Sequence, residues 1–239
     1  MPKIFSHTES RKKAAPRSRT RKAGAKSPEV QRIFLLSPAN ASGIRAQVIL
    51  REGAQFPLAR RLRETGAPLG EIFAFVSGLY FRGKLAYATA FARPPARMPG
   101  ALVITACGGL MPPETLLTRE RLRDISGAPV SATEPRYRAP LERDARRLAK
   151  EIGSGCEVVL LGSVATPKYV EPLLEIFGDR LMFPAEFAGR GDMSRGGLML
   201  RCVTAGVQLT YTKVADGARH GSRPPKLSRM DADPGTASR

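Results

Sequence analysis

Three short apolar runs alternate along the chain with longer segments in which apolar positions recur every three or four residues. The short runs are Ile33–Ser37, Ala101–Thr105 and Glu157–Ser163, and each is bounded by small or polar residues. Continuous apolar runs with such boundaries are typical of strands that are buried on both faces, because no polar side chain alternates with the apolar ones. They therefore predict the strands of a parallel sheet.

Helical spacing marks the segments between these runs. Residues 54–64 and 71–92 each carry an apolar stripe, and Gly78 and Gly83 are positions where the second could divide into two helices. Further helices are predicted over residues 141–152 and 167–177. Strands that alternate with helices in this order predict a single α/β domain with a mostly parallel central sheet flanked by helices.

Small and polar residues follow all three predicted strands. The three exits are Ser37–Gly43, Thr105–Gly109 and Gly162–Thr166. Because parallel α/β sheets bind ligands at the carboxyl ends of their strands, we expect these exits to converge on one site.

Several residues at these exits are candidates for holding a phosphate or another polar group. Hydroxyl and amide side chains accept and donate hydrogen bonds, and cationic side chains contact anions. A turn rich in small residues, or a helix N-cap, would use the same residue types. The candidates are Ser37, Asn40, Ser42, Arg45, Ser163, Thr166 and Lys168.

The segment 183–197 combines glycines with charged side chains and lacks an apolar period. Arg190 and Arg195 suit a bidentate contact with phosphate or carboxylate. Two arginines should keep Asp192 ionised, which suits hydrogen-bond acceptance or oxocarbenium stabilisation, and Glu186 is then the better proton donor. The segment is predicted to be a flexible loop that is either catalytic or a solvent-exposed network of ion pairs.

Positive charge is concentrated at the N-terminus. The chain of 239 residues has a formal net charge of +18, and residues 1–28 hold nine basic side chains and one acid. Those residues have almost no large apolar groups, so we expect a disordered basic arm at 1–28, a folded body at 29–213 and a loose basic tail at 214–239. The body by itself is still cationic.

A cationic body with a cationic arm favours a polyanionic partner, above all DNA or RNA. A solvated basic face and an acidic membrane surface are the alternatives. No run of about eighteen apolar residues occurs, and no apolar segment follows the basic N-terminus. The sequence therefore predicts a cytoplasmic protein that does not enter a membrane.

Histidine and cysteine restrict the available chemistry. The two histidines, His7 and His220, lie in the predicted arm and tail, so the body should lack Ser-His and Cys-His catalysis. Cys107 follows a strand where a nucleophile could sit, although a small buried residue is the default interpretation. The three cysteines are widely spaced and acids are scarce, which predicts no metal site and no cofactor.

Two stretches carry a resemblance to a known family. Leu79–Ala88 begins a helix with Leu-Tyr, and Val103–Glu114 ends a strand in small residues followed by Gly-Leu and Pro. Over residues 33–118 the layout is similar to prokaryotic domains related to the peroxide-stress protein YaaA and to the C-terminal part of archaeosine synthase. Ser37 stands where those domains often have Cys or Ser, although the usual Lys of that loop is missing. The resemblance implies an α/β fold linked to modified bases, DNA damage or nucleic-acid binding.

These observations lead to one hypothesis and two alternatives. The leading hypothesis is a nucleic-acid-associated enzyme of N-glycosidic or nucleotide-transfer type, with its site at the strand ends. A second reading is a non-catalytic nucleic-acid-binding protein that uses the arm together with Arg146, Arg147 and Lys150. A third is an enzyme acting on a small-molecule nucleotide, whose arm serves only localisation.

Overall fold

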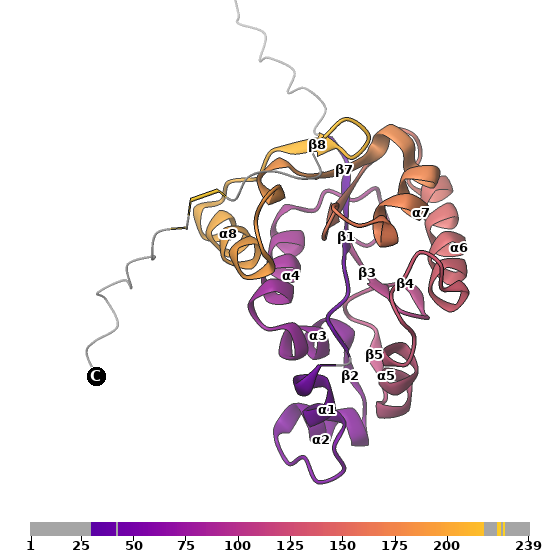
Figure 1. Ribbon diagram of the computed structural model, residues 1–239, viewed down its shortest axis with the longest axis vertical. Helices are drawn as coiled ribbons and strands as arrows, with labels where there is room; N and C mark the ends of the chain where they lie inside the picture. Colours follow the sequence, from indigo (N-terminus) through magenta and orange to yellow (C-terminus); the bar gives the residue numbers. More distant parts are fainter. Residues whose placement is uncertain (1–29, 42, 218–223, 226, 228–239) are drawn as a thin grey trace, which may run out of the picture.

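A mostly parallel sheet forms the centre of the molecule (Figure 1). The computed structural model describes residues 30–41, 43–217, 224–225 and 227. In the order β4-β3-β1-β6-β7-β8, the four central strands run parallel and the two edge strands run antiparallel to their neighbours. The strands are β1 (Arg32–Leu36), β3 (Ala101–Thr105), β4 (Gly109–Met111), β6 (Glu157–Leu161), β7 (Leu181–Pro184) and β8 (Tyr211–Lys213).

Helices cover both faces of this sheet (Figure 1). One face packs against α4 (Leu79–Phe91) and α8 (Asp192–Ala205), and the other packs against α6 (Pro135–Glu151) and α7 (Pro167–Phe177). The side chains of β1 alternate between two apolar clusters, with Phe34 on the α4 side and Leu35 on the α6 side, and both are fully buried. The predicted α/β fold with helices on both faces is confirmed.

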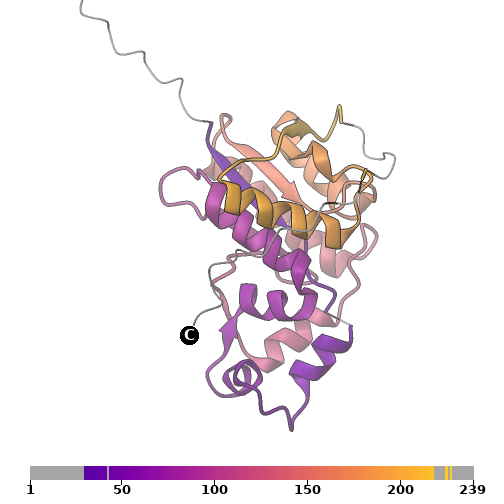
Figure 2. The ribbon, with the colours of Figure 1, turned by 90° about the vertical axis from the view of Figure 1, so that its left-hand side faces the viewer.

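A smaller lobe lies beyond the carboxyl ends of the strands (Figures 1 and 2). Its two short strands pair antiparallel, which ties the segment after α2 to the segment before α5. The lobe is formed by α1 (Ile44–Leu50), α2 (Pro57–Glu64), β2 (Ala67–Pro68), α3 (Leu69–Ser77), β5 (Leu116–Leu117) and α5 (Arg119–Ser126). The pattern of the sequence predicts its longer helices but not the strand pair, because two-residue strands have no measurable period.

The two glycines of the long apolar stripe have different roles. Gly78 adopts φ 61° and separates α3 from α4, as one of the two predicted break points. Gly83 instead lies inside α4, where a Cβ atom would come 2.7 Å from the carbonyl oxygen of Gly196 in α8. Figure 2 shows α8 lying along α4. Glycine at positions 83 and 196 allows α4 and α8 to approach closely, since no side chain separates their backbones.

The glycine-rich segment 183–197 is more ordered than a flexible loop. It comprises the end of β7, a short 3-10 helix (Ala185–Phe187) and the first turns of α8, which begins at Asp192. The prediction of a loop there is wrong because tertiary packing replaces the missing apolar period. Gly196 lets α8 lie against the start of α4, and the buried Arg195 ties the first turn of α8 to the carbonyl of Phe187.

The ends of the body differ slightly from the predicted bounds. Val214, at the start of the predicted tail, is fully buried and donates its backbone N–H to the carbonyl of Leu181. The predicted arm, residues 1–28, lies outside the described residues, as does most of the tail. Among the helices that the structure describes, none is both long enough and apolar enough to cross a lipid bilayer.

Candidate functional site

A pocket of about 370 Å³ opens at the carboxyl edge of the sheet, between the strand ends and the lobe. Its position follows from the strand order. The chain passes from β1 to β3 on one side and then crosses to β6 on the other, and ligands bind where an α/β sheet reverses direction in this way. All three strand exits contribute to it, through Ser37, Ala106 and Ser163. We call it the strand-end pocket.

Ser37, which lines the pocket, forms a buried pair with Lys84 of α4, which lies behind it. Ser37 follows β1 directly and is 4% exposed, while Lys84 of α4 is fully buried. The Lys84 Nζ atom lies 2.9 Å from Ser37 Oγ and 2.5 Å from the Ser37 carbonyl oxygen. Gly162 allows this placement, because a Cβ atom there would come 2.9 Å from the Cβ atom of Ser37.

Lys84 lies beside two aromatic rings. Its Nζ atom lies 4.3 Å from the ring centroid of Tyr80 and 4.9 Å from that of Phe81. Burial lowers the pKa of Lys84 from its ordinary value of 10.5 to about 7, with Asp192 opposing the change and Arg195 adding to it. A large fraction of the side chain is therefore a neutral amine at physiological pH.

Two tyrosines at the pocket also have shifted pKa values. Burial raises the pKa of Tyr80 to about 12, and Arg195 and Ser37 approach its hydroxyl closely enough to oppose the rise. That hydroxyl is nevertheless buried without a hydrogen bond of good geometry to any described residue. Burial also raises the pKa of Tyr169, with Tyr80 and Asp192 adding to the rise. Both phenols therefore stay protonated, and the carboxylate of Asp192 lies near them.

Asp192 lies at the mouth of the pocket at the start of α8, with 68% of its side chain exposed. Its Oδ1 atom is 3.7 Å from Nη1 of Arg195. The Arg195 side chain is 10% exposed, and its Nε and Nη2 atoms donate hydrogen bonds of 3.2 and 3.0 Å to the carbonyl of Phe187. Arg195 is thus held rigidly behind Asp192, and the pair balances charge at the mouth.

Protein-family models, curated proteins and solved structures provide no match to this chain. The resemblance to the domains related to YaaA and archaeosine synthase therefore stays a prediction. The chemistry of the site has to be argued from its own residues.

The structure brings five of the predicted site residues together. They come from two strand exits, the first turn of α7 and the start of α8. Those that line the strand-end pocket are Ser37, Asn40, Ser163, Lys168 and Asp192.

Other predicted residues lie elsewhere. Thr166 is the exposed N-cap residue of α7. Glu186 does not line the pocket: its Oε1 atom accepts a 3.0 Å hydrogen bond from the backbone N–H of Thr210. Arg190 donates to the carbonyl of Glu186 and to Ser194 Oγ, and Arg195 supports Asp192 from behind. Ser42 lies outside the described residues.

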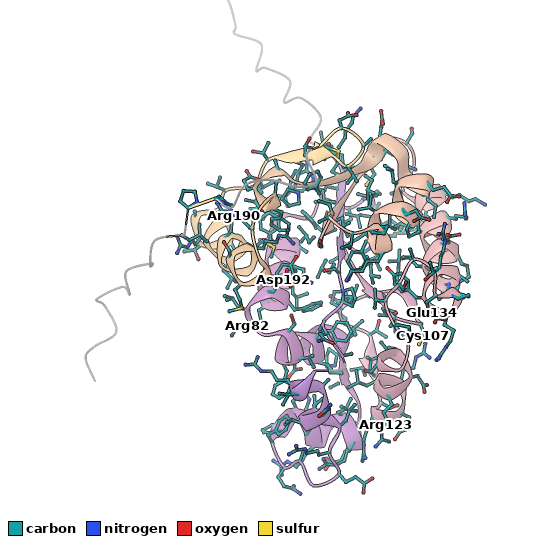
Figure 3. The ribbon with its side chains drawn as sticks, in the orientation of Figure 1. Arg82, Cys107, Arg123, Glu134, Arg190 and Asp192 are labelled. Atoms are coloured by element: carbon teal, nitrogen blue, oxygen red, sulfur yellow. The ribbon has the colours of Figure 1, made fainter. Side chains whose placement is uncertain are left out.

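The second strand exit is mainly a structural turn. The Sγ atom of Cys107 lies 3.1 Å from the carbonyl oxygen of Asp124 and does not line the pocket. Figure 3 shows Cys107 well separated from Asp192. Thr105 and the buried Asp144 hold the turn, the latter by accepting a 3.1 Å hydrogen bond from the Leu110 N–H. These contacts support a packing role for Cys107.

Two open grooves adjoin the strand-end pocket. The first, which we call the arginine groove, is lined by Arg45, Arg82 and Met193 and shares Ser77 with the pocket. The second lies beside Arg190 and shares Asp192 with the pocket. Figure 3 shows Arg82, Asp192 and Arg190 on the same side of the molecule. Within the described residues, no three histidine, cysteine, aspartate or glutamate side chains cluster as a metal site.

The sequence pattern does not single out Lys84, Tyr80 or Tyr169. Tyr80 and Lys84 lie four residues apart on the apolar stripe of α4, and a lysine within such a stripe is the one available signal. The lysine is buried against Ser37 at the end of β1, and α8 approaches α4 closely at the neighbouring Gly83, which no local pattern predicts.

Proposed function

We propose that this protein is an enzyme that acts on one nucleotide or base of a nucleic acid, by N-glycosidic or nucleotide-transfer chemistry, in the strand-end pocket. The observation that carries the proposal is the arrangement of a pocket with polar and apolar lining beside a groove that contains two arginines. The pocket volume of about 370 Å³ suits a small ligand or a single inserted unit of a polymer. A duplex would not enter it.

The grooves supply what a polymer requires outside the pocket. Arg45 and Arg82 are both exposed in the arginine groove, where the one acidic lining residue is Glu71. Guanidinium groups contact phosphates without reading the bases, so a strand could lie along the groove while one nucleotide enters the pocket. The formal net charge of +18 favours the same partner.

The basic face of α6 is a weaker candidate for this contact. Arg146 is 3.1 Å from Glu142 and 3.5 Å from Glu175, and Arg147 is 3.9 Å from Asp144. Charges that are already paired attract phosphate less strongly than unpaired ones. The α6 face is therefore a less well supported phosphate contact than the arginine groove, and so is the alternative of a purely binding protein that uses it.

The double substitution of Arg45 and Arg82 by Ala should weaken binding of a single-stranded oligonucleotide. Removing two phosphate contacts should lower the slope of log affinity against log salt by about 1.4. Fluorescence anisotropy of full-length protein across a salt series measures this slope. The matched control is the double substitution of Arg146 and Arg147 by Ala, which removes the same charge from an ion-paired face.

The two variants separate the alternatives. A larger loss in the α6 variant would contradict the arginine groove and favour the binding-protein reading. Equally small losses of affinity in both variants would mean that neither surface is the main contact with nucleic acid. The basic arm would then be the expected contact region.

Replacing Asp192 by Ala should abolish turnover while leaving oligonucleotide affinity unchanged. Asp192 lines the pocket and is not part of the arginine groove, and loss of a positioned carboxylate typically lowers rates by about 100-fold to 10,000-fold. Mass spectrometry of oligonucleotides incubated with the protein would detect a released base or a changed phosphodiester. Asp179→Ala, at a site paired with Lys213, is the control. Product formed only from free nucleotides would favour the small-molecule reading instead.

A further inference from the structure

The buried amine of Lys84 is in an unusual setting for a lysine. It makes its hydrogen bonds with Ser37 and lies beside two aromatic rings, and no carboxylate among the described residues forms an ion pair with it. A charged lysine without a paired carboxylate is strongly disfavoured when it is fully buried. The neutral amine is the form that this environment accepts.

A neutral amine can receive a proton from Ser37. The Ser37 carbonyl oxygen can only accept, so one N–H of Lys84 is directed to it over 2.5 Å. The lone pair of the amine is then available to the Ser37 hydroxyl, 2.9 Å away. Ser37 lines the pocket and Lys84 does not, so the amine lies behind the serine as seen from the pocket. This is the relation of a nucleophile to its base.

We propose that Ser37 is the nucleophile of the strand-end pocket, that Lys84 is its general base, and that the substrate is attacked at a phosphodiester phosphorus. The inference rests on the proposed function and selects nucleotide transfer from its two reaction types.

The covalent step balances without another reagent. Ser37 Oγ forms a bond to phosphorus while its proton passes to the Lys84 amine, and the P–O bond to the departing nucleotide oxygen breaks. The resulting ammonium returns its proton to that oxygen. Water or another nucleotide hydroxyl then attacks the Ser37 phosphodiester, losing its proton to Lys84, and the ammonium gives a proton back to Ser37 Oγ as the enzyme ester bond breaks.

The surroundings of Ser37 suit a phosphoryl group. Lys168, in the first turn of the eleven-residue helix α7, and Ser163, in the segment before that helix, line the same pocket. Unpaired backbone N–H groups at a helix start stabilise anions. An independent observation is the buried Tyr80 hydroxyl, which makes no hydrogen bond of good geometry to a described residue and belongs to a side chain that lines the pocket.

The groups facing Lys84 define the expected pH dependence. Ser37 faces it from the end of β1, Tyr80 and Phe81 from its own helix, and Asp192 and Arg195 influence it from α8. Asp192 favours the ammonium and Arg195 opposes it, and burial exceeds both, which places the pKa of Lys84 at about 7. Nucleophilic reactivity of Ser37 should therefore rise with pH and be half-maximal near pH 7.

The test uses a fluorophosphonate probe on the full-length protein. Ser37 should displace fluoride and gain the phosphonate mass, which peptide mapping locates. Ser37→Ala should abolish this label, and Lys84→Met should slow it by at least about 100-fold. Ser154→Ala, on an exposed turn before β6, should label like the natural protein. The pH profile of the natural protein is a second measurement, which needs no variant to fold.

Each outcome decides the proposal. Label at Ser37 that depends on Lys84 and is half-maximal near pH 7 supports it. Absence of label, or an equal rate in Lys84→Met, overturns the dyad. Turnover of p-nitrophenyl acetate without turnover of bis(p-nitrophenyl) phosphate overturns the assignment to phosphorus. Oligonucleotide turnover that needs Asp192 but not Ser37 would overturn this inference alone, while label without oligonucleotide turnover would contradict only the proposed function.

Discussion

The natural protein is expected to become more stable relative to the Lys84→Met variant as the pH rises from about 7 toward 10. In the unfolded chain Lys84 has a pKa near 10.5, and in the folded protein burial lowers it to about 7. Between these values the unfolded state binds the extra proton. The free energy of unfolding therefore increases with pH in this window and is flat below it, where both states are protonated.

The size of the effect follows from the shift. Each pKa unit corresponds to about 1.4 kcal/mol, so the full window is worth about 5 kcal/mol, and a change from pH 7 to pH 9 is worth about 2.5 kcal/mol. Methionine has a similar length and no charge, so the variant should lack this component. At all pH values the variant should still lose about 1–3 kcal/mol of unfolding free energy, because the donor to the Ser37 carbonyl is missing.

Urea unfolding of both proteins at pH 6, 7, 8 and 9 measures the difference in free energy of unfolding. The tyrosines and cysteines are shared by the two proteins, so their titration largely cancels in the difference. A difference that stays constant from pH 6 to pH 9 would show that Lys84 keeps an ordinary pKa when folded. That result would also remove the main support for its role as a base.

Three of the four central strands could be predicted from the sequence because burial on both faces leaves a local record, whereas the four-residue strand β7 was not predicted. Ile33–Ser37, Ala101–Thr105 and Glu157–Ser163 correspond to β1, β3 and β6, which lie side by side in the sheet. The convergence of their exits follows from parallel pairing alone. The edge strand β8 is short and partly exposed, so it leaves no such record.

The candidate site was predictable only in part, because its chemistry depends on contacts between distant elements. Ser37 and Asp192 are visible in the sequence as polar residues at loop positions. Lys84 is not, since its environment arises where β1, α4 and α8 meet. Glu186 illustrates the reverse case: its polarity suggested a proton donor, whereas its Oε1 atom accepts from the Thr210 N–H at the β7–β8 edge. Local patterns identify side-chain types, and tertiary contacts decide which of them face one cavity.

Replacing Gly109 by Ala should destabilise the protein far more than replacing Gly153 by Ala. Both glycines have positive φ, 71° and 68°, so both substitutions incur the left-handed strain of about 1–2 kcal/mol. A Cβ atom on residue 153 meets nothing within 4 Å. On residue 109 it would overlap Oδ2 of Asp144 and come 2.8 Å from the carbonyl oxygen of Pro140.

The additional loss of unfolding free energy in Gly109→Ala, compared with Gly153→Ala, measures how tightly α6 holds the turn after β3. Asp144 is 6% exposed and accepts the Leu110 N–H, so it can move aside only by leaving that donor unsatisfied. Overpacking of about 1–3 kcal/mol adds to the strain, so Gly109→Ala should lose about 2–5 kcal/mol in total. Urea unfolding of both variants at one pH measures the difference. Equal losses would mean that the turn is not clamped by α6, and the second strand exit would then have to be reconsidered as a mobile part of the site.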